Sequence, residues 1–172
     1  MHLYVFYLGG NAGKSNIEVH DIQFAAASQP EEAWPALREA WFGDANKVHI
    51  DGYGKLSWAD GYRIMLCPHP PENQKHRLWF VNAGAYDASS LAELHEFGFF
   101  IAADAGAAKK RALQQLLRGK LHQHKDNLKE VDDFLLLDKV GGQYVHLIPD
   151  ETGAPFMPEW QGYQPIGLTA RA

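Results

Sequence analysis

Two short patterns in this sequence combine residue types that bind metal ions or transfer protons. One is Glu-x-His and the other is His-x-Asp, and each occurs twice. Carboxylate oxygens and imidazole nitrogens are ligands for zinc, manganese and iron, and a carboxylate can also orient a histidine that acts as a general base. The candidate metal ligands are Glu18, His20, His49, Asp51, Glu93, His95, His124 and Asp126.

The first Glu-x-His pattern lies in a segment that alternates like a β-strand. Successive side chains of a strand point to opposite faces, so Glu18 and His20 share one face with large apolar residues, Ile22 and Phe24. Burying a carboxylate or an imidazole without a partner costs several kcal/mol. Each of these side chains is therefore expected to find a partner, and the two can serve each other.

Three interpretations of these patterns stay open at the level of sequence. If the fold gathers the first set, its two imidazoles and two carboxylates suit a divalent metal. A carboxylate-oriented histidine acting as general base is the catalytic use of the same atoms. Hydrogen-bonded pairs that only hold a strand to a loop are the structural use, and retention in both halves favours it slightly. The first set is Glu18, His20, His49 and Asp51, and the second is Glu93, His95, His124 and Asp126.

A constant offset of 75 residues superimposes the first half of the chain on the second. Both chemical patterns belong to this internal repeat, which predicts two structural units of similar design. The matching segments are 3–9 with 78–84, 18–21 with 93–96, and 49–51 with 124–126.

One helix is predicted in each half. In the first, Trp34, Leu37 and Trp41 recur on one helical face, Ser28 is a candidate N-cap and Gly43 ends the helix. The second helix is predicted over 107–118, with three leucines facing inward. These leucines are Leu113, Leu116 and Leu117.

Strands fill most of the remaining sequence. The pairs Asp60-Gly61 and Gly141-Gly142 predict two-residue hairpin turns, the second within a longer hairpin than the first. The predicted strands are 3–8, 17–27, 56–59 and 62–66, with 48–51 extended, then 78–81, 93–102, 134–140 and 144–148.

These elements predict an α+β protein of two tandem β-β-α-β-β repeats related by a pseudo-twofold axis, mainly antiparallel sheet with helices packed on it. The expected parts are a first repeat at 1–67, a Pro-rich linker at 68–76, a second repeat at 77–149 and an irregular tail at 150–172. Prolines, which lack an N–H, define the linker and the tail. We expect one compact globular unit, with the tail wrapped over the body or reaching a partner.

Composition limits the classes of function. The chain has 172 residues, 46% of them apolar, and a net charge of −5, which argues against nucleic acid as a partner. No apolar run approaches the roughly 18 residues of a membrane span, so no membrane partner is expected. Cys67 is the single cysteine and the first residues lack a signal-peptide pattern, which predicts a cytoplasmic location.

The segment Gly9–Ser15 (GGNAGKS) resembles a phosphate-binding loop but has the wrong spacing. That motif requires glycine at position 8, where Leu8 stands, and a helix after the loop, where a strand is predicted. No cofactor-binding motif is therefore evident, and a divalent metal is the one candidate cofactor.

A series of short motifs resembles the bacterial family called domain of unknown function 1543. The motifs are LYVFYLGG, NIEVHDIQF, a helix ending in WFG, VHID and ADGYRI, and they lie between Leu3 and Leu66. The second half departs from the pattern, with Asn82 before the glycine and Leu117-Arg118-Gly119 at the end of the helix. The resemblance implies a tandem α+β arrangement in a cytoplasmic bacterial protein, and it implies no activity.

The preferred prediction is a module that binds a small polar ligand between the repeats, or a partner protein, as a homo-oligomer. The alternative is a metal-assisted or His-based hydrolase that uses the Glu-x-His and His-x-Asp residues.

Overall fold

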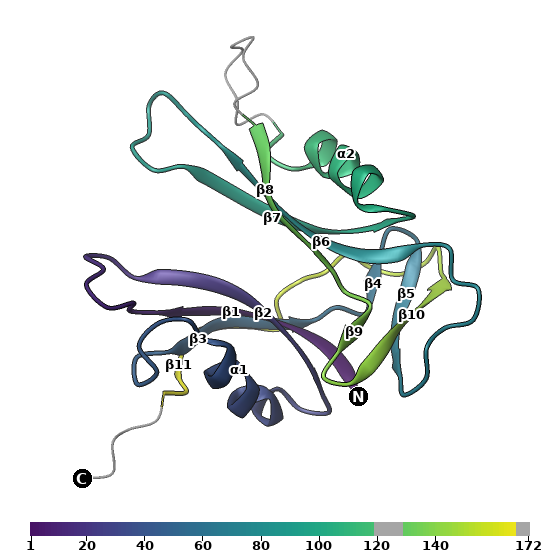
Figure 1. The fold of residues 1–172 in the computed structure, drawn as a ribbon, viewed down its shortest axis with the longest axis horizontal. Helices are drawn as coiled ribbons and strands as arrows, with labels where there is room; N and C mark the ends of the chain where they lie inside the picture. Colours follow the sequence, from purple (N-terminus) through teal and green to yellow (C-terminus); the bar gives the residue numbers. More distant parts are fainter. Residues whose placement is uncertain (119–128, 168–172) are drawn as a thin grey trace.

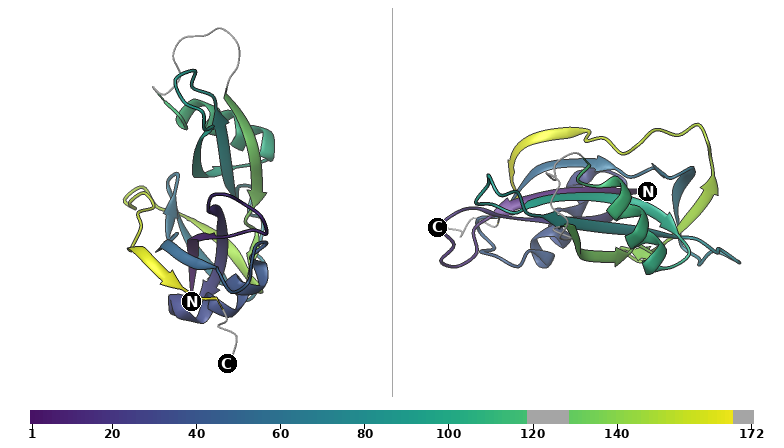
Figure 2. Two further views of the ribbon diagram at one scale, coloured as in Figure 1. Left: turned by 90° about the vertical axis from the view of Figure 1, so that its left-hand side faces the viewer. Right: turned by 90° about the horizontal axis from the view of Figure 1, so that it is seen from above.

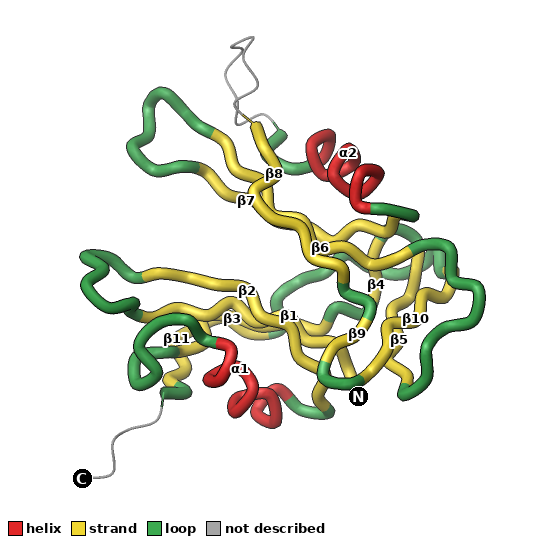
Figure 3. Tube along the Cα trace, viewed as in Figure 1, coloured by secondary structure: helices red, strands yellow, loops and turns green. Residues whose placement is uncertain are grey.

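The computed structural model describes residues 1–118 and 129–167. Two helix-covered sheets diverge from a common base (Figure 1). The chain is mainly antiparallel β-structure with two short α-helices in the described residues, an α+β arrangement (Figure 3). The elements are β1 (His2–Gly10), β2 (Val19–Ala27), a 3-10 turn (Pro30–Ala33), α1 (Trp34–Ala40), β3 (His49–Lys55), β4 (Trp58–Ala59), β5 (Tyr62–Cys67), β6 (Arg77–Ala85), β7 (Leu94–Ala102), α2 (Ala105–Gln115), β8 (Lys129–Leu136), β9 (Lys139–Val140), β10 (Gln143–Pro149) and β11 (Trp160–Pro165).

Three sheets organise these strands. The first sheet has the order β11-β3-β1-β2, the second has the order β7-β6-β8, and a third, β4-β5-β10-β9, joins the two halves. In the third sheet β5 pairs antiparallel with β10, so each half supplies one hairpin. Helix α1 lies on the outer face of the first sheet and α2 on the outer face of the second (Figure 1).

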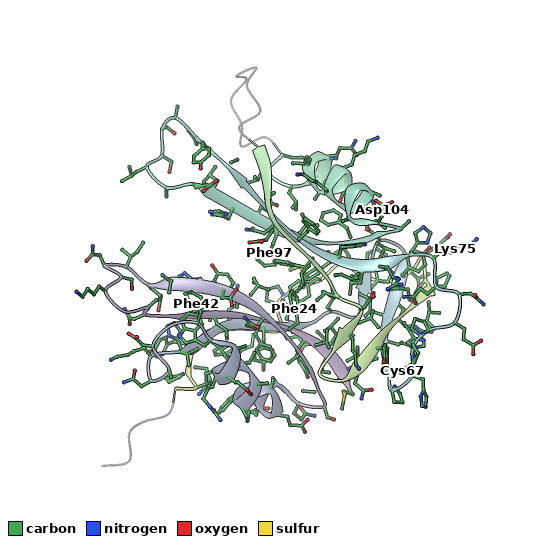
Figure 4. The ribbon with its side chains drawn as sticks, viewed as in Figure 1. Phe24, Phe42, Cys67, Lys75, Phe97 and Asp104 are labelled. Atoms are coloured by element: carbon green, nitrogen blue, oxygen red, sulfur yellow. The ribbon has the colours of Figure 1, made fainter. Side chains whose placement is uncertain are left out.

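The central core lies where the three sheets meet. Leu3 and Val5 of β1 pack with Leu78 and Phe80 of β6, and both β-hairpins of the third sheet contribute to the same cluster. The ring of Phe24 lies edge-on to that of Phe80, with centroids 5.3 Å apart. Figure 4 shows Phe24 and Phe97 between the two sheets. Neither half therefore buries its inner face without the other.

Each outer core is covered by its own helix. Leu37 of α1 packs on Tyr4, Phe6 and Leu8, the residues of β1 that alternate with the inner-face positions. In the second half, Ala108 and Ala112 of α2 pack on β6 and β7. None of the helices in the described residues combines the length and the apolarity that crossing a membrane requires.

Several element boundaries differ from the sequence prediction. Each half has one strand more than the expected β-β-α-β-β unit, because the segment after the helix forms one long strand before the hairpin. Residues 134–136 belong to β8 and pair with β6, so β9 has two residues. Each hairpin then has two paired positions, and β10 is one residue longer than β5. The turns themselves are confirmed: Asp60 and Gly61 both have positive φ, as do Gly141 and Gly142.

The helices begin and end elsewhere than predicted. Gln29, not Ser28, precedes the 3-10 turn at Pro30, and Trp41 is already extended. Helix α2 is capped by Asp104, whose side chain accepts a hydrogen bond from the Ala107 N–H, and it ends at Gln115. Leu116 and Leu117 are buried just beyond the helix. Capping and packing thus outweigh the periodic pattern at these ends.

The sequence predicted an irregular C-terminal tail, but part of this tail forms a strand. Its residues Trp160–Pro165 form β11, which pairs antiparallel with β3 and covers the edge of the first sheet. Figure 2 shows the segment after β10 running along the molecule to this strand. The prolines permit this pairing because an edge strand needs only part of its N–H groups. The expectation that the tail wraps over the body is met within the described residues.

Asp60 connects the first hairpin to the second half. Its carboxylate accepts a hydrogen bond from the Ile101 N–H at 2.7 Å and lies 2.9 Å from Arg111 Nη2. Its φ of 49° is in the left-handed region, which aspartate and asparagine tolerate better than alanine.

We predict that Asp60→Ala lowers the free energy of unfolding by about 1–3 kcal/mol, because it leaves the Ile101 N–H without its acceptor. Asp60→Asn is the matched control, since it keeps both the turn conformation and a backbone acceptor, and it should lose less than half as much. Urea unfolding followed by circular dichroism measures both variants. Equal stability of Asp60→Ala and the wild type would contradict a connecting role.

Candidate metal site

The candidate site is built around a glycine in the middle strand of the first sheet. Gly9 of β1 pairs with His20 of β2 on one side and with His49 of β3 on the other. A Cβ at Gly9 would lie 2.6 Å from His49 Nε2 and 2.7 Å from Asp51 Oδ2. The missing side chain therefore provides the space in which the flanking residues meet.

A β-bulge lies at the aspartate. Leu8 pairs with Ile50 and Tyr7 pairs with Gly52, so Asp51 is the extra residue of β3 and has no residue directly opposite it on β1. Asp51 shares the inner face of the sheet with His49 by the period of a strand, while Ile50 between them packs in the outer core. Glu18 completes the set from the residue before β2.

All four side chains from the first half converge. Nε2 of His49 lies 3.0 Å from Glu18 Oε1 and 3.1 Å from Asp51 Oδ1. Nε2 of His20 lies 3.3 Å from Asp51 Oδ2 and 3.5 Å from Glu18 Oε2. Candidate ligand atoms of Glu18, His20 and Asp51 all lie within 4.8 Å of one another. We call these four residues, Glu18, His20, His49 and Asp51, the two-His two-carboxylate cluster.

Hydrogen bonding fixes the tautomer of His49. Its Nδ1 lies 3.3 Å from the Lys47 carbonyl oxygen, which can only accept, so Nδ1 carries a hydrogen. The other nitrogen, Nε2, then faces two carboxylate oxygens, a repulsive arrangement for a neutral ring. Either a proton or a metal ion on Nε2 relieves the repulsion, and a histidine that donates from Nδ1 to a carbonyl while Nε2 binds metal is a common arrangement.

The contact distances are compatible with a shared metal ion. Charge-assisted hydrogen bonds between nitrogen and carboxylate are about 2.7–2.9 Å long. The four contacts of the cluster are longer, 3.0–3.5 Å. Ligand atoms about 2.0–2.2 Å from a common metal lie about 3.0–3.5 Å apart in octahedral or tetrahedral geometry. Glu18, His20 and Asp51 therefore have a spacing that ligands of one ion can share. The two His49 contacts also fit ordinary hydrogen bonds.

Aromatic residues enclose the cluster from two sides. The ring of Tyr163 in β11 lies over His49, with centroids 4.3 Å apart, and His49 is only 3% exposed. Tyr7 stacks on His20 at 5.1 Å. Burial raises the pKa of the Tyr7 phenol, and the negative charges of Asp51 and Glu18 raise it further. Glu18 is half exposed, so the cluster stays open to solvent on that side.

A cavity of about 390 Å³ adjoins the cluster on the inner face of the first sheet. Asp51 belongs to both the cluster and the cavity wall. The other lining residues come from the first sheet, from β7 of the second half and from the tail. They are Val5, Tyr7, Ile22, Gly52, Tyr53, Phe97, Phe156, Pro158 and Gln161.

The second half does not repeat the cluster in the described residues. His95 Nε2 lies 3.7 Å from Glu93 Oε2, so that Glu-x-His pair is in place. His124 and Asp126 lie outside the described residues. The strand residue that pairs with Gly84, as His49 pairs with Gly9, is Glu130. The constant offset therefore holds for the first two strands of each half and not for the third.

Three residues at the site have no part in the sequence prediction. Gly9 and Tyr7 share the inner face of β1 by the period of a strand, a signal that a sequence could have supplied once β1 was placed in the centre of the sheet. Tyr163 contacts His49 because β11 pairs with β3. No residue pattern within the tail indicates that pairing.

Comparison with known proteins gives a family and a similar structure without an assigned activity. A family model described as Domain of Unknown Function (DUF1543) matches residues 15–66 and 90–139, one segment in each half. The crystal structure of protein Il1583 from Idiomarina loihiensis is similar, with a TM-score of 0.76 and 34% identity over 97% of this chain and 99% of that chain. No curated protein matches the sequence.

We predict that Gly9→Ala lowers the free energy of unfolding by about 1–3 kcal/mol, because its methyl group would overlap His49 and Asp51. Gly106→Ala in α2 is the control, since alanine favours a helix and the nearest atom, Oδ1 of the capping Asp104, lies 3.3 Å away and needs to shift by only a few tenths of an ångström. Thermal and urea unfolding compare the two. A Gly9→Ala protein as stable as Gly106→Ala would show that Gly9 is not required for space.

We predict that the Tyr7 phenol titrates above the ordinary pKa of about 10. The folded protein then keeps a proton that the unfolded chain releases, so the Tyr7 contribution to stability is lost as pH rises from about 10 through the folded pKa. The difference in tyrosinate absorbance between wild type and Tyr7→Phe isolates this group. A divalent cation in the cluster should lower the pKa, and no response to any cation would argue against an ion beside Tyr7.

Proposed function

The chain belongs to the DUF1543 family, whose function is unknown, and from its geometry we propose that it binds one divalent metal ion and a small ligand beside it. The ion is held by Glu18, His20 and Asp51, with His49 Nε2 against the same two carboxylates, and the ligand occupies the adjoining cavity. Zinc, manganese and iron suit this mixture of imidazole and carboxylate ligands.

One observation carries the proposal. His49 is almost fully buried, donates from Nδ1 to a backbone carbonyl and directs Nε2 between two carboxylates. The hydrogen bond from Nδ1 to the carbonyl and the convergence of three strands on one point suit a metal ligand that is held in advance.

The two carboxylates also supply the charge that a divalent cation requires. With both histidines neutral, the cluster carries two negative charges, and a divalent ion balances them. Three of the four ligands come from paired strands or the bulge of β3, so their backbone is held in place before the ion arrives. Such a site loses little conformational entropy when it binds.

We also propose that the two halves are copies of one unit about a pseudo-twofold axis. The register supports this, since His2 pairs with Ala27 and Arg77 pairs with Ala102, a shift of 75 residues in both partners. The third strand of each half has its register irregularity at the equivalent place, Tyr7/Leu8 and Asn82/Ala83. In this proposal the first half keeps the complete set of ligands.

Native mass spectrometry of the purified protein after incubation with Zn²⁺, Mn²⁺ or Fe²⁺ tests the proposal. We expect one bound ion per chain, and its loss in the double variant His20→Gln/His49→Gln. Because His49 is buried, Glu18→Gln serves as a second variant at a half-exposed position, and it should weaken metal binding at least tenfold while the protein stays folded.

Glu93→Gln is the matched control, because Glu93 occupies the position of Glu18 in the second half. Metal binding should be unchanged in this variant. A wild-type protein that retains none of the three metals would contradict the proposal and leave the cluster as a structural staple. The same spectra count the chains in the assembly, and therefore also test the expected homo-oligomer.

A further inference from the structure

The cavity beside the cluster is apolar over most of its wall and polar at one end. Most of its wall is apolar and comes from both halves, with Val5 and Ile22 on one side, Phe97 on the other and Phe156 from the tail. Polar groups lie where the cavity meets the cluster, at Asp51 and Tyr7, with Gln161 on the tail. A ligand that fits this wall has an apolar body and one polar end.

The size of the cavity sets the scale of the ligand. A volume of about 390 Å³ is at the lower end of the range for small-molecule sites. Aromatic side chains form part of the wall: Phe97 contacts the rings of Phe80 and Phe99, and Phe99 contacts the ring of Phe156. Rings in this arrangement pack well against another ring, which favours a ligand with an aryl body.

The metal determines the charge of the polar end. Without an ion, the carboxylates of Asp51 and Glu18 repel an anion at the mouth of the cavity. With a divalent ion bound, four protein ligands leave further positions for an oxygen ligand when the ion is six-coordinate. The half-exposed Glu18 and His20 leave room on that side of the cluster.

We propose that the cavity binds an aryl-alkyl carboxylate whose carboxylate group coordinates the ion and whose ring lies among Val5, Ile22, Phe97 and Phe156. This inference rests on the proposed metal site. Tyr7 lines the cavity beside Asp51, at the carboxylate end, where its hydroxyl donates a hydrogen bond to the ligand.

The experiment uses 4-phenylbutyrate as the probe and 4-phenylbutyramide as its neutral control. Calorimetric titration of the metal-loaded protein should show at least tenfold tighter binding of the carboxylate, and this preference should disappear when the metal is removed. In the Mn²⁺-loaded protein, the methylene protons next to the carboxylate should relax faster than the ring protons, because they lie closer to the ion.

Ile22→Trp fills the cavity and should weaken probe binding at least tenfold without changing metal affinity. Ile17→Trp makes the same substitution at a residue that is 78% exposed, and it should leave probe binding unchanged. Equal binding of the carboxylate and the amide, or faster relaxation of the ring protons, would overturn this inference while metal binding persists. Loss of metal binding in the wild type would instead overturn the proposed function itself.

Discussion

The fold depends on one shared apolar core, because each half has an inner face that it cannot bury alone. The inner residues of β1 and β6 meet at the base of the molecule, and the hairpins β4-β5 and β9-β10 close the core from the side. The pairing of β5 with β10 exchanges backbone hydrogen bonds between the halves. Burial and pairing thus act together, and the divergence of the two sheets away from this core creates the space that the cavity occupies.

The same constraint explains where polar chemistry is tolerated. Near the base, inner-face positions of β1 and β2 are apolar, as at Val5 and Phe24. Farther along the strands the sheets separate, and His20 and Glu18 take the same face in partial contact with solvent. A polar cluster there keeps its histidines paired with carboxylates, whereas the same cluster beside Phe80 would displace apolar packing.

Much of this arrangement could be predicted from the sequence. The period of two correctly put Glu18 and His20 on the face of Ile22 and Phe24, and the two hairpin turns follow from Asp60-Gly61 and Gly141-Gly142. The internal repeat matched residues 3–9 with 78–84, and these segments lie in β1 and β6, each of which has a strand on both sides. These features depend on local conformation and side-chain periodicity, which a single sequence records.

The rest depends on pairing between distant segments, which the sequence does not record. The bulge at Asp51 follows from the match of β3 to β1, and the strand β11 exists only because the edge of β3 is available. The third strand of the second half pairs in a register that puts Glu130 opposite Gly84. The offset of 75 residues between the halves therefore does not hold for this strand. Residue spacing indicated the members of the cluster, but only the pairing of three strands defines their distances.

The position of Tyr163 has a consequence for biosynthesis. Glu18, His20, His49 and Asp51 leave the ribosome early, but the ring that covers His49 and the wall at residues 156–161 are made more than a hundred residues later. A nascent chain therefore exposes the buried imidazole to the cell until the last strand docks. The enclosed form of the site therefore requires residues 156–163, so it cannot form before that segment has been made.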